Sequence, residues 1–122
     1  MSEAARIQLG VPPSNRLFGS NRYQTAIAIA GKARSASWLT GSPTIFGIAT
    51  SLPDALAAGP MLGAKGGPLL LSAPGGATIR AETSGYLTNP ASVPSLGYGF
   101  VCGGTDKVPE AARLGLMGTL NP

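Results

Sequence analysis

Histidine is absent from this sequence of 122 residues, and cysteine occurs once, at Cys102. Without histidine, neither a Ser-His-Asp triad nor the usual zinc sites built on cysteine and histidine can form, and a single cysteine excludes an internal disulfide. Cys102 also lacks the histidine that commonly activates a nucleophilic thiol, so we expect it to be a packed side chain on a buried strand. The sequence therefore predicts no catalytic residue, no metal and no cofactor.

Charged residues are scarce as well, at 11% of the chain against roughly 25% in typical soluble domains. Nine Lys and Arg against five Asp and Glu give a net charge of +4. The basic residues are scattered and are not interleaved with aromatic residues, which argues against a nucleic-acid interface. A surface with so little charge favours contact with another protein surface, and the positive balance supports only a modest preference for acidic polymers.

Long apolar runs are missing too. No stretch approaches the roughly 18 uninterrupted apolar residues of a membrane helix, and the beginning of the chain contains Glu3 and no apolar signal-peptide core. We therefore expect no membrane insertion, no export by a cleavable signal, and synthesis in the cytoplasm. Pro12 and Pro13 favour extended backbone, so residues 1–15 are predicted to form an extended arm and residues 16–122 a single module.

Helical and strand patterns alternate along the rest of the chain. Apolar residues recur at helical spacing in three segments, residues 22–34, 76–87 and 108–117. Another helix is expected to begin at Pro53 and to kink or break after Gly59, because Pro60 lacks an N–H. Short apolar runs predict strands at residues 44–49, 69–72 and 99–102, with a loop over residues 88–96. This order predicts an α/β fold, a Rossmann-like three-layer module with a short parallel sheet and right-handed crossovers.

Four short patches follow one another along the chain: residues 16–26 (RLFGSNRYQTA), 52–58 (LPDALAA), 67–72 (GPLLLS) and 100–105 (FVCGGT). In this order and spacing they resemble the cell wall binding repeat 2 family. Its pattern begins with Arg-apolar-x-Gly-x-Asp-Arg-Tyr-x-Thr-Ala, continues with Asp-Ala-Leu after a strand and with Pro-apolar-Leu-Leu, and ends with a strand followed by Gly-Gly-Thr. The resemblance covers roughly residues 16–116.

The resemblance implies a Rossmann-like module that associates in threes, with tandem repeats as neighbours, and binds anionic glycopolymers of the Gram-positive envelope without chemistry. The chain departs from the pattern at Asn21, where the family usually has Asp, and at Ile48 and Ala49, which replace small residues. It also holds one module instead of three. A lone module can rebuild the threefold arrangement only as a homotrimer.

The candidates for ligand binding or for contacts between subunits are Arg16, Arg22, Tyr23, Thr25, Asp54, Gly103, Gly104 and Thr105. Arg16 and Arg22 flank the start of a helix, where the helix dipole favours a phosphate or carboxylate. The alternative, which we favour, is that Arg22 pairs with Asp54 or caps a carbonyl group. Tyr23 and Thr25 have the same two interpretations, and tyrosine is more often a core residue than a ligand contact.

Asp54 and the two glycines also have structural interpretations. A single carboxylate lacks the partner that acid-base catalysis usually requires, so Asp54 is expected to stabilise the start of its helix. Gly103 and Gly104 follow a strand, as in phosphate-binding loops, but the GxGxxG and Walker patterns are absent. A tight turn that needs the backbone freedom of glycine is the preferred interpretation.

Three functions stay open at this point. The leading hypothesis is a homotrimer that decorates a surface, such as a stand-alone bacteriophage virion protein on a capsid or another lattice, in contact with anionic cell-wall polysaccharide. The second is an anchoring repeat excised from a secreted autolysin or S-layer protein at the cell surface. The third is a small nucleotide-binding Rossmann-like enzyme, which predicts a deep pocket with perturbed carboxylates.

Overall fold

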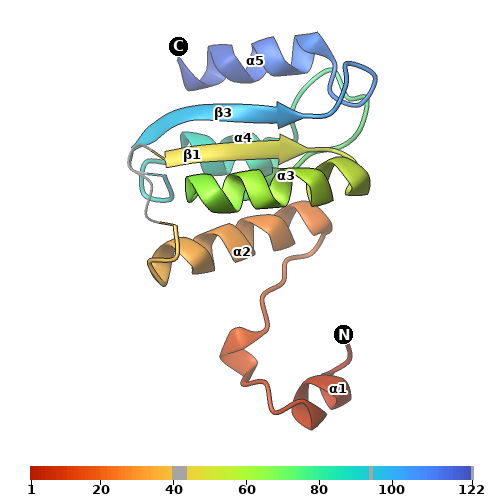
Figure 1. Cartoon of the computed structure of the whole chain (residues 1–122), viewed down its shortest axis with the longest axis vertical. Helices are drawn as coiled ribbons and strands as arrows, with labels where there is room; N and C mark the ends of the chain where they lie inside the picture. Colours follow the sequence, from red (N-terminus) through yellow and green to blue (C-terminus); the bar gives the residue numbers. More distant parts are fainter. Residues whose placement is uncertain (40–43, 94, 122) are drawn as a thin grey trace.

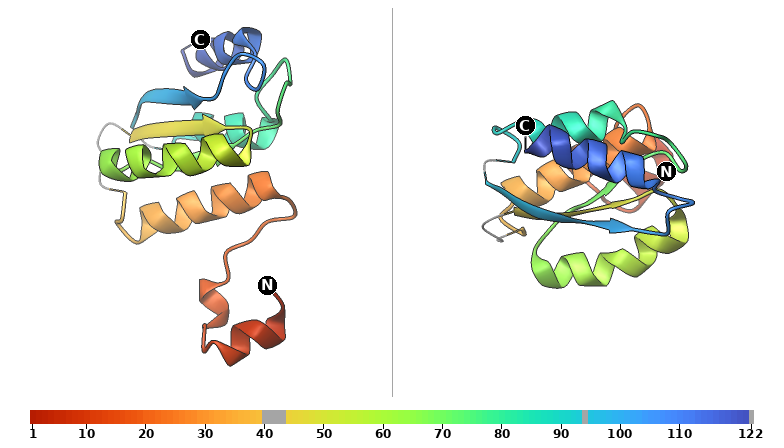
Figure 2. Two further views of the ribbon diagram at one scale, coloured as in Figure 1. Left: turned by 45° about the vertical axis from the view of Figure 1, so that its right-hand side comes forward. Right: turned by 90° about the horizontal axis from the view of Figure 1, so that it is seen from above.

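The computed structural model describes residues 1–39, 44–93 and 95–121. Its elements are α1 (Glu3–Gln8), the 3-10 helix η1 (Pro13–Asn15), α2 (Arg22–Ser35), β1 (Thr44–Ala49), α3 (Leu52–Lys65), β2 (Leu69–Leu71), α4 (Ala81–Thr88), β3 (Leu96–Cys102) and α5 (Glu110–Leu120). The strands form a three-stranded parallel sheet in the order β2-β1-β3. Helix α3 covers one face, and α2, α4 and α5 lie on the other (Figures 1 and 2). The predicted α/β class is confirmed.

The sequence of the central strand β1 decides how the helices approach the sheet. Phe46 and Ile48 belong to the buried core formed with α2, α4 and α5. Because side chains alternate along a strand, Gly47 and Ala49 face α3 instead. A Cβ on Gly47 would lie 2.4 Å from the nearest methyl carbon of Leu62 in α3. Helix α3 therefore packs very close to the sheet, and most of the core lies on the opposite face.

Local capping signals set the starts of α2 and α3. The Asn21 side chain accepts a hydrogen bond from the Gln24 N–H at 2.9 Å, and the Ser51 side chain accepts one from the Asp54 N–H at 3.4 Å. Both arrangements satisfy a backbone donor that the helix itself leaves free. The predicted starts of α2 and β1 are confirmed, and α3 begins one residue before Pro53.

Helix α3 runs through Pro60 to Lys65, so the interruption expected after Gly59 does not occur. Proline removes the N–H that would bond to the carbonyl of Leu56. Leu56 and Pro60 both lie on the exposed side of α3, where water can bond to that carbonyl. The cost of the missing bond is therefore small enough for the helix to continue.

Two segments after β2 differ from the prediction. Helix α4 begins at Ala81, whereas the sequence pattern places its start at residue 76. The preceding residues are held as a loop, because the Arg80 N–H donates to Ser72 Oγ at 2.9 Å and the Gly75 N–H donates to the Lys107 carbonyl at 2.8 Å. Gly75 has a φ of 71°, which a helix does not allow.

The last strand and helix are shifted as well. Strand β3 begins at Leu96, inside the segment predicted as a loop, because Leu96 pairs with Thr44 of β1 and a register irregularity follows. Pairing with the central strand overrides the low strand propensity of the glycines in this segment. Helix α5 spans Glu110–Leu120, about two residues later than predicted, since Pro109 stands at its N-cap.

Residues 1–15, named the arm below, contain α1 and η1, so the predicted extended conformation is wrong for part of the segment. The Arg6 side chain is buried inside the arm, where it pairs with Glu3 and donates to the carbonyl of Val11. The arm stands clear of the module in the views of Figures 1 and 2. None of the described helices is long and apolar enough to cross a bilayer.

Replacing Gly67 by alanine is expected to destabilise the fold. A Cβ there would lie 2.3 Å from the carbonyl oxygen of Ile45, which is backbone and cannot rotate away. We expect Gly67→Ala to lower the free energy of unfolding by about 1–3 kcal/mol, measured by urea denaturation. Gly85→Ala is the matched control, because Gly85 is exposed in α4 with no atom near its added Cβ; it should stabilise by about 0.5–1 kcal/mol. Equal effects of the two substitutions would contradict this packing.

Candidate functional site

The loops that follow the three strands meet at the carboxyl edge of the sheet, where the strand arrows end in Figure 1. The carbonyl of Lys107, after β3, accepts hydrogen bonds from Thr50 Oγ1 at 3.1 Å and from the Gly75 N–H at 2.8 Å. Thr50 follows β1 and Gly75 follows β2, so one carbonyl ties the three loops together. Strands β1 and β3 then lead to helices on opposite faces, the arrangement in which open α/β sheets bind ligands.

Asp54 and Gly103 come from different sequence patches and lie in contact at this edge. A Cβ on Gly103 would be 2.8 Å from Asp54 Oδ2, and Gly103 has a φ of 128°. The Ser51 hydroxyl donates to the same carboxylate oxygen at 2.5 Å. These contacts place Asp54 in the cap of α3 and leave no room for a side chain at residue 103.

Cys102 ends β3 beside this contact. Its thiol is partly buried, and burial, reinforced by the negative charge of Asp54, raises the pKa of the thiol above its ordinary value. A raised pKa keeps the sulfur protonated and unreactive at neutral pH. Cys102 is thus suited to packing rather than to nucleophilic chemistry.

Two guanidinium groups lie over the buried ring of Tyr23. The central carbons of Arg22 and Arg80 are 5.0 and 4.5 Å from its centroid, and Arg22 Nη2 donates to the Tyr23 hydroxyl at 2.9 Å. Arg80 pairs with Glu82 at 2.6 Å, and this hydrogen bond lowers the pKa of the Glu82 carboxyl. Tyr23 is therefore a core residue that positions two arginines.

Arg22 borders a hollow of about 270 Å³ at the carboxyl edge. The other residues around the hollow come from the ends of β1 and β2 and from the start of α3: Thr50, Ser51, Leu52, Ala55, Leu71 and Ser72. Within the described part of the chain, Arg22 forms no ion pair with Asp54 or with any other carboxylate, so the favoured pairing of Arg22 with Asp54 is wrong. Its exposed guanidinium is free to bind a carboxylate or phosphate.

The other candidates are divided between the arm, a loop and the turn after β3. Arg16 donates to Glu3 Oε2 at 3.0 Å and to the Met1 carbonyl at 2.6 Å, so it is tied to the arm rather than to the start of α2. Thr25 Oγ1 accepts from the Gly19 N–H and donates to the Asn21 carbonyl, both at 3.0 Å, which closes the loop before α2. Gly104 and Thr105 are exposed in the turn after β3.

Sequence reasoning did not single out Arg80, Lys107 or Ser72 as parts of this edge. Lys107 is exposed and, within residues 1–39, 44–93 and 95–121, makes no ion pair. The spacing of Arg80 and Glu82 was a weak signal for their ion pair, but the approach of Arg80 to Tyr23 depends on the packing of α4 against α2. No group of three or more potential metal ligands occurs among the described residues.

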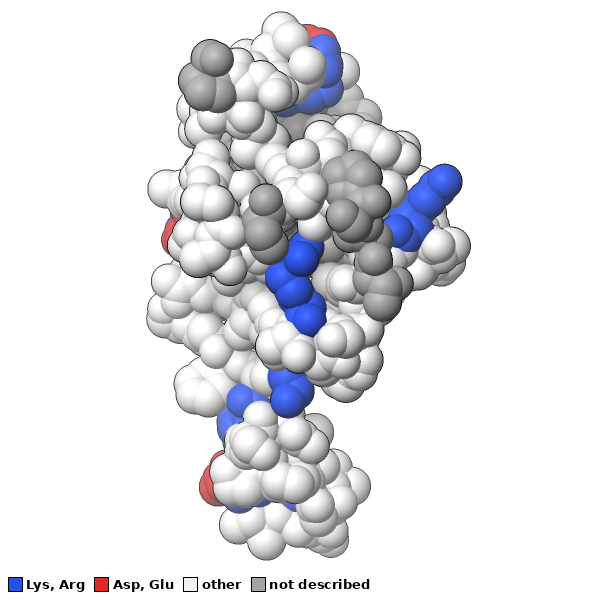
Figure 3. Space-filling model, turned by 90° about the vertical axis from the view of Figure 1, so that its left-hand side faces the viewer, with Lys and Arg blue, Asp and Glu red and all other residues white. Residues whose placement is uncertain are grey.

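Figure 3 shows the opposite side of the molecule, toward the amino ends of the strands. Lys and Arg side chains are spread from the arm to α5, and most of the surface between them is uncharged (Figure 3). No dense cationic patch is seen on that side. The scattered charge agrees with the low charge content of the sequence.

Replacing Gly103 tests the contact with Asp54. Gly103→Ala adds a Cβ where the backbone is in the left-handed region and the carboxylate is 2.8 Å away, so we expect a loss of about 1–3 kcal/mol in the free energy of unfolding. Gly104→Ala is the neighbouring control, since the only close atom there is the mobile end of the Asp106 side chain. A Gly103→Ala protein as stable as Gly104→Ala in chemical denaturation would rule out the tight contact.

Comparison with protein-family models matches residues 16–113 to the model of cell wall binding domain 2 (CWB2). The four sequence patches that resemble the cell wall binding repeat 2 family all lie inside this range. The resemblance is therefore confirmed. No curated protein and no solved structure matches the chain.

Proposed function

Because the chain belongs to the cell wall binding domain 2 family, we propose that it is a non-catalytic module that binds an anionic polymer of the bacterial cell wall. The observation that carries the proposal is the family match over residues 16–113. Membership in this family implies association with the cell surface. We further propose that residues 16–122 act as one module, to which the arm is an addition.

The carboxyl edge is the part of the module best suited to an anionic polymer. Arg22 and Lys107 are exposed cations there, and neither makes an ion pair within the described residues. The positive end of α3 already has the Asp54 carboxylate beside it. Arg80 is different, since Glu82 already neutralises it. A polymer carrying phosphate or carboxylate groups at intervals would meet Arg22 at the hollow and Lys107 at the turn after β3.

The outer face of α3 supports self-association. Leu52 and Leu56 lie one helical turn apart on α3 and are 71% and 69% exposed. Exposed apolar patches on soluble proteins mark interaction sites, and an identical copy is a partner that every molecule has. We propose a homotrimer, the assembly that the resemblance implies, with the outer face of α3 at its interface.

Two settings suit such a homotrimer about equally well. One is decoration of a virion capsid or another lattice protein, and the other is an anchoring repeat of a secreted wall protein. A nucleotide-binding enzyme is less well supported, because the family that matches the chain is described as a cell wall binding domain. Peptide mass spectrometry of purified virions and of cell-wall fractions would separate the two settings.

Arg22→Ala is expected to weaken polymer binding without unfolding the module. Its guanidinium is exposed, and among the described residues its one acceptor is the Tyr23 hydroxyl. Loss of this charged hydrogen-bond donor should reduce affinity about tenfold. The measurement is co-sedimentation with purified Gram-positive cell walls at several salt concentrations. Lys65→Ala removes the same charge at the other end of α3 and should change affinity by less than about twofold. If the unaltered protein does not sediment with walls, polymer binding is refuted.

Leu56→Glu is expected to convert the proposed homotrimer into monomers, because it places a charge on the outer face of α3 where copies would meet. Light scattering coupled to size-exclusion chromatography gives the mass directly. Leu114→Glu introduces the same charge at an exposed position of α5 and should leave the mass unchanged. A monomeric mass for the unaltered protein at high concentration would exclude the homotrimer.

A further inference from the structure

The arm exposes apolar side chains that its own module does not cover. Ile7 and Leu9 are 64% and 66% exposed. Helix α1 has only six residues, and isolated helices this short are not stable in water. The Ser2 cap and the Glu3–Arg6 ion pair order the arm internally. The ordered arm thus presents Ile7 and Leu9 on its surface.

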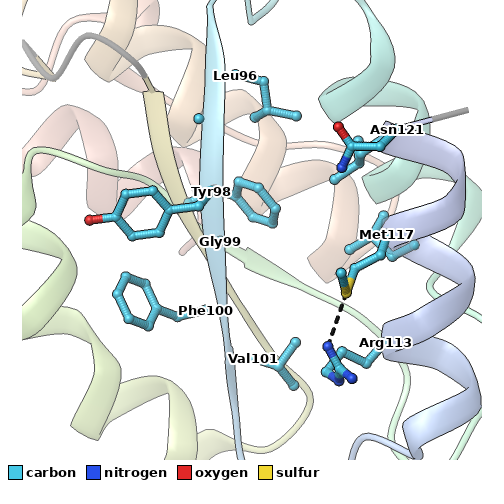
Figure 4. Close-up of a pocket in the computed structure, with 12 residues that line it drawn as sticks. Leu96, Tyr98, Gly99, Phe100, Val101, Arg113, Met117 and Asn121 are labelled. Atoms are coloured by element: carbon cyan, nitrogen blue, oxygen red, sulfur yellow. Dashed lines mark hydrogen bonds between the residues drawn. The ribbon is translucent and has the colours of Figure 1, made fainter.

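The opposite end of the molecule has a groove that is lined mainly by apolar side chains. It lies between β3 and α5, has a volume of about 530 Å³, and is bordered mainly by apolar side chains (Figure 4): Phe46, Leu96, Val101, Leu116, Met117 and Leu120. Strand β3 is at the edge of the sheet and pairs only with β1 among the described strands. The groove therefore has an apolar floor and one unpaired strand edge.

We propose that the arm of one copy docks in the β3–α5 groove of a second copy, with Ile7 inserted. The groove of about 530 Å³ has room for this side chain, because an apolar cavity of ~150 Å³ already holds one benzene ring. The charges agree as well. Arg113, the charged residue at the groove, is already paired with Glu110, and the inserted Ile7 side chain carries no charge, so docking buries no unpaired ion.

The positions of arm and groove determine the kind of contact. Helix α1 and α5 lie at opposite ends of the molecule (Figures 1 and 2), so arm and groove form a head-to-tail contact, which closes into a ring when the rotation permits. The arm and the groove both include residues outside the family match, which covers residues 16–113. These residues are the whole arm and, in the groove, Leu116, Met117 and Leu120. This inference rests on the proposed self-association and is independent of polymer binding.

Disulfide trapping between chains tests the contact. In a Cys102→Ala background, full-length Ile7→Cys protein is mixed with full-length Met117→Cys protein and oxidised, and the linked peptides are identified by mass spectrometry. We expect a 7–117 link that forms about tenfold faster or more than a 7–114 link from Ile7→Cys and Leu114→Cys, because docking raises the effective concentration of the two thiols. Leu114 is exposed on α5 but does not border the groove.

A second measurement separates arm docking from the α3 interface. Ile7→Asp should weaken self-association about tenfold or more, whereas Ala4→Asp, also exposed on α1, should not. Assembly that survives Ile7→Asp but is lost in Leu56→Glu would overturn arm docking and leave the homotrimer standing. Equal rates for the two links would also overturn it, as would a link found only within single chains of an Ile7→Cys/Met117→Cys protein.

Discussion

The close approach of α3 to β1 is the contact on which the rest of the arrangement depends. Gly47 gives Leu62 the space to lie against the sheet, and a side chain at residue 47 would push the helix outward. Because the inner face of α3 meets glycine and alanine, it buries few large side chains, Leu62 above all. Leu52 and Leu56 are turned to solvent on the outer face of α3, where we propose that copies meet.

The same packing fixes the carboxyl edge. Only Thr50 and Ser51 separate β1 from α3, so the position of α3 sets the position of its cap and of Asp54. Ala49 pairs with Cys102, the last residue of β3. Gly103 follows directly, and a Cβ there would lie 2.8 Å from Asp54 Oδ2. The carboxyl edge, where we propose that a polymer binds, thus depends on a register that is set inside the sheet.

Sequence patterns predicted a helix or strand correctly where residues close in the chain determine it, such as a capping side chain or a run of strand-forming residues. The Asn21 cap predicted α2, the β-branched and aromatic residues after Gly and Pro predicted β1, and the order of elements predicted the fold class. They failed where distant contacts decide: β3 is lengthened by pairing with β1, the start of α4 is delayed by a bond to Ser72, and Pro60 is tolerated because its side of α3 is solvated. For the site, the patches identified Arg22 and Asp54, but only the fold shows that they are unpaired with each other.

In the proposed assembly, the docked arm would hold copies together that are not joined in tandem. Where modules are joined in tandem, the linker holds neighbours at a high effective concentration, and a weak interface is then enough for assembly. Separate chains lose this advantage and must bury more surface to associate at the same concentration. A preordered arm lowers that requirement, since its internal contacts with Arg6 already restrict it before docking. In the proposed assembly, the docked arm would add contact area outside residues 16–113 and so lower the concentration at which copies associate.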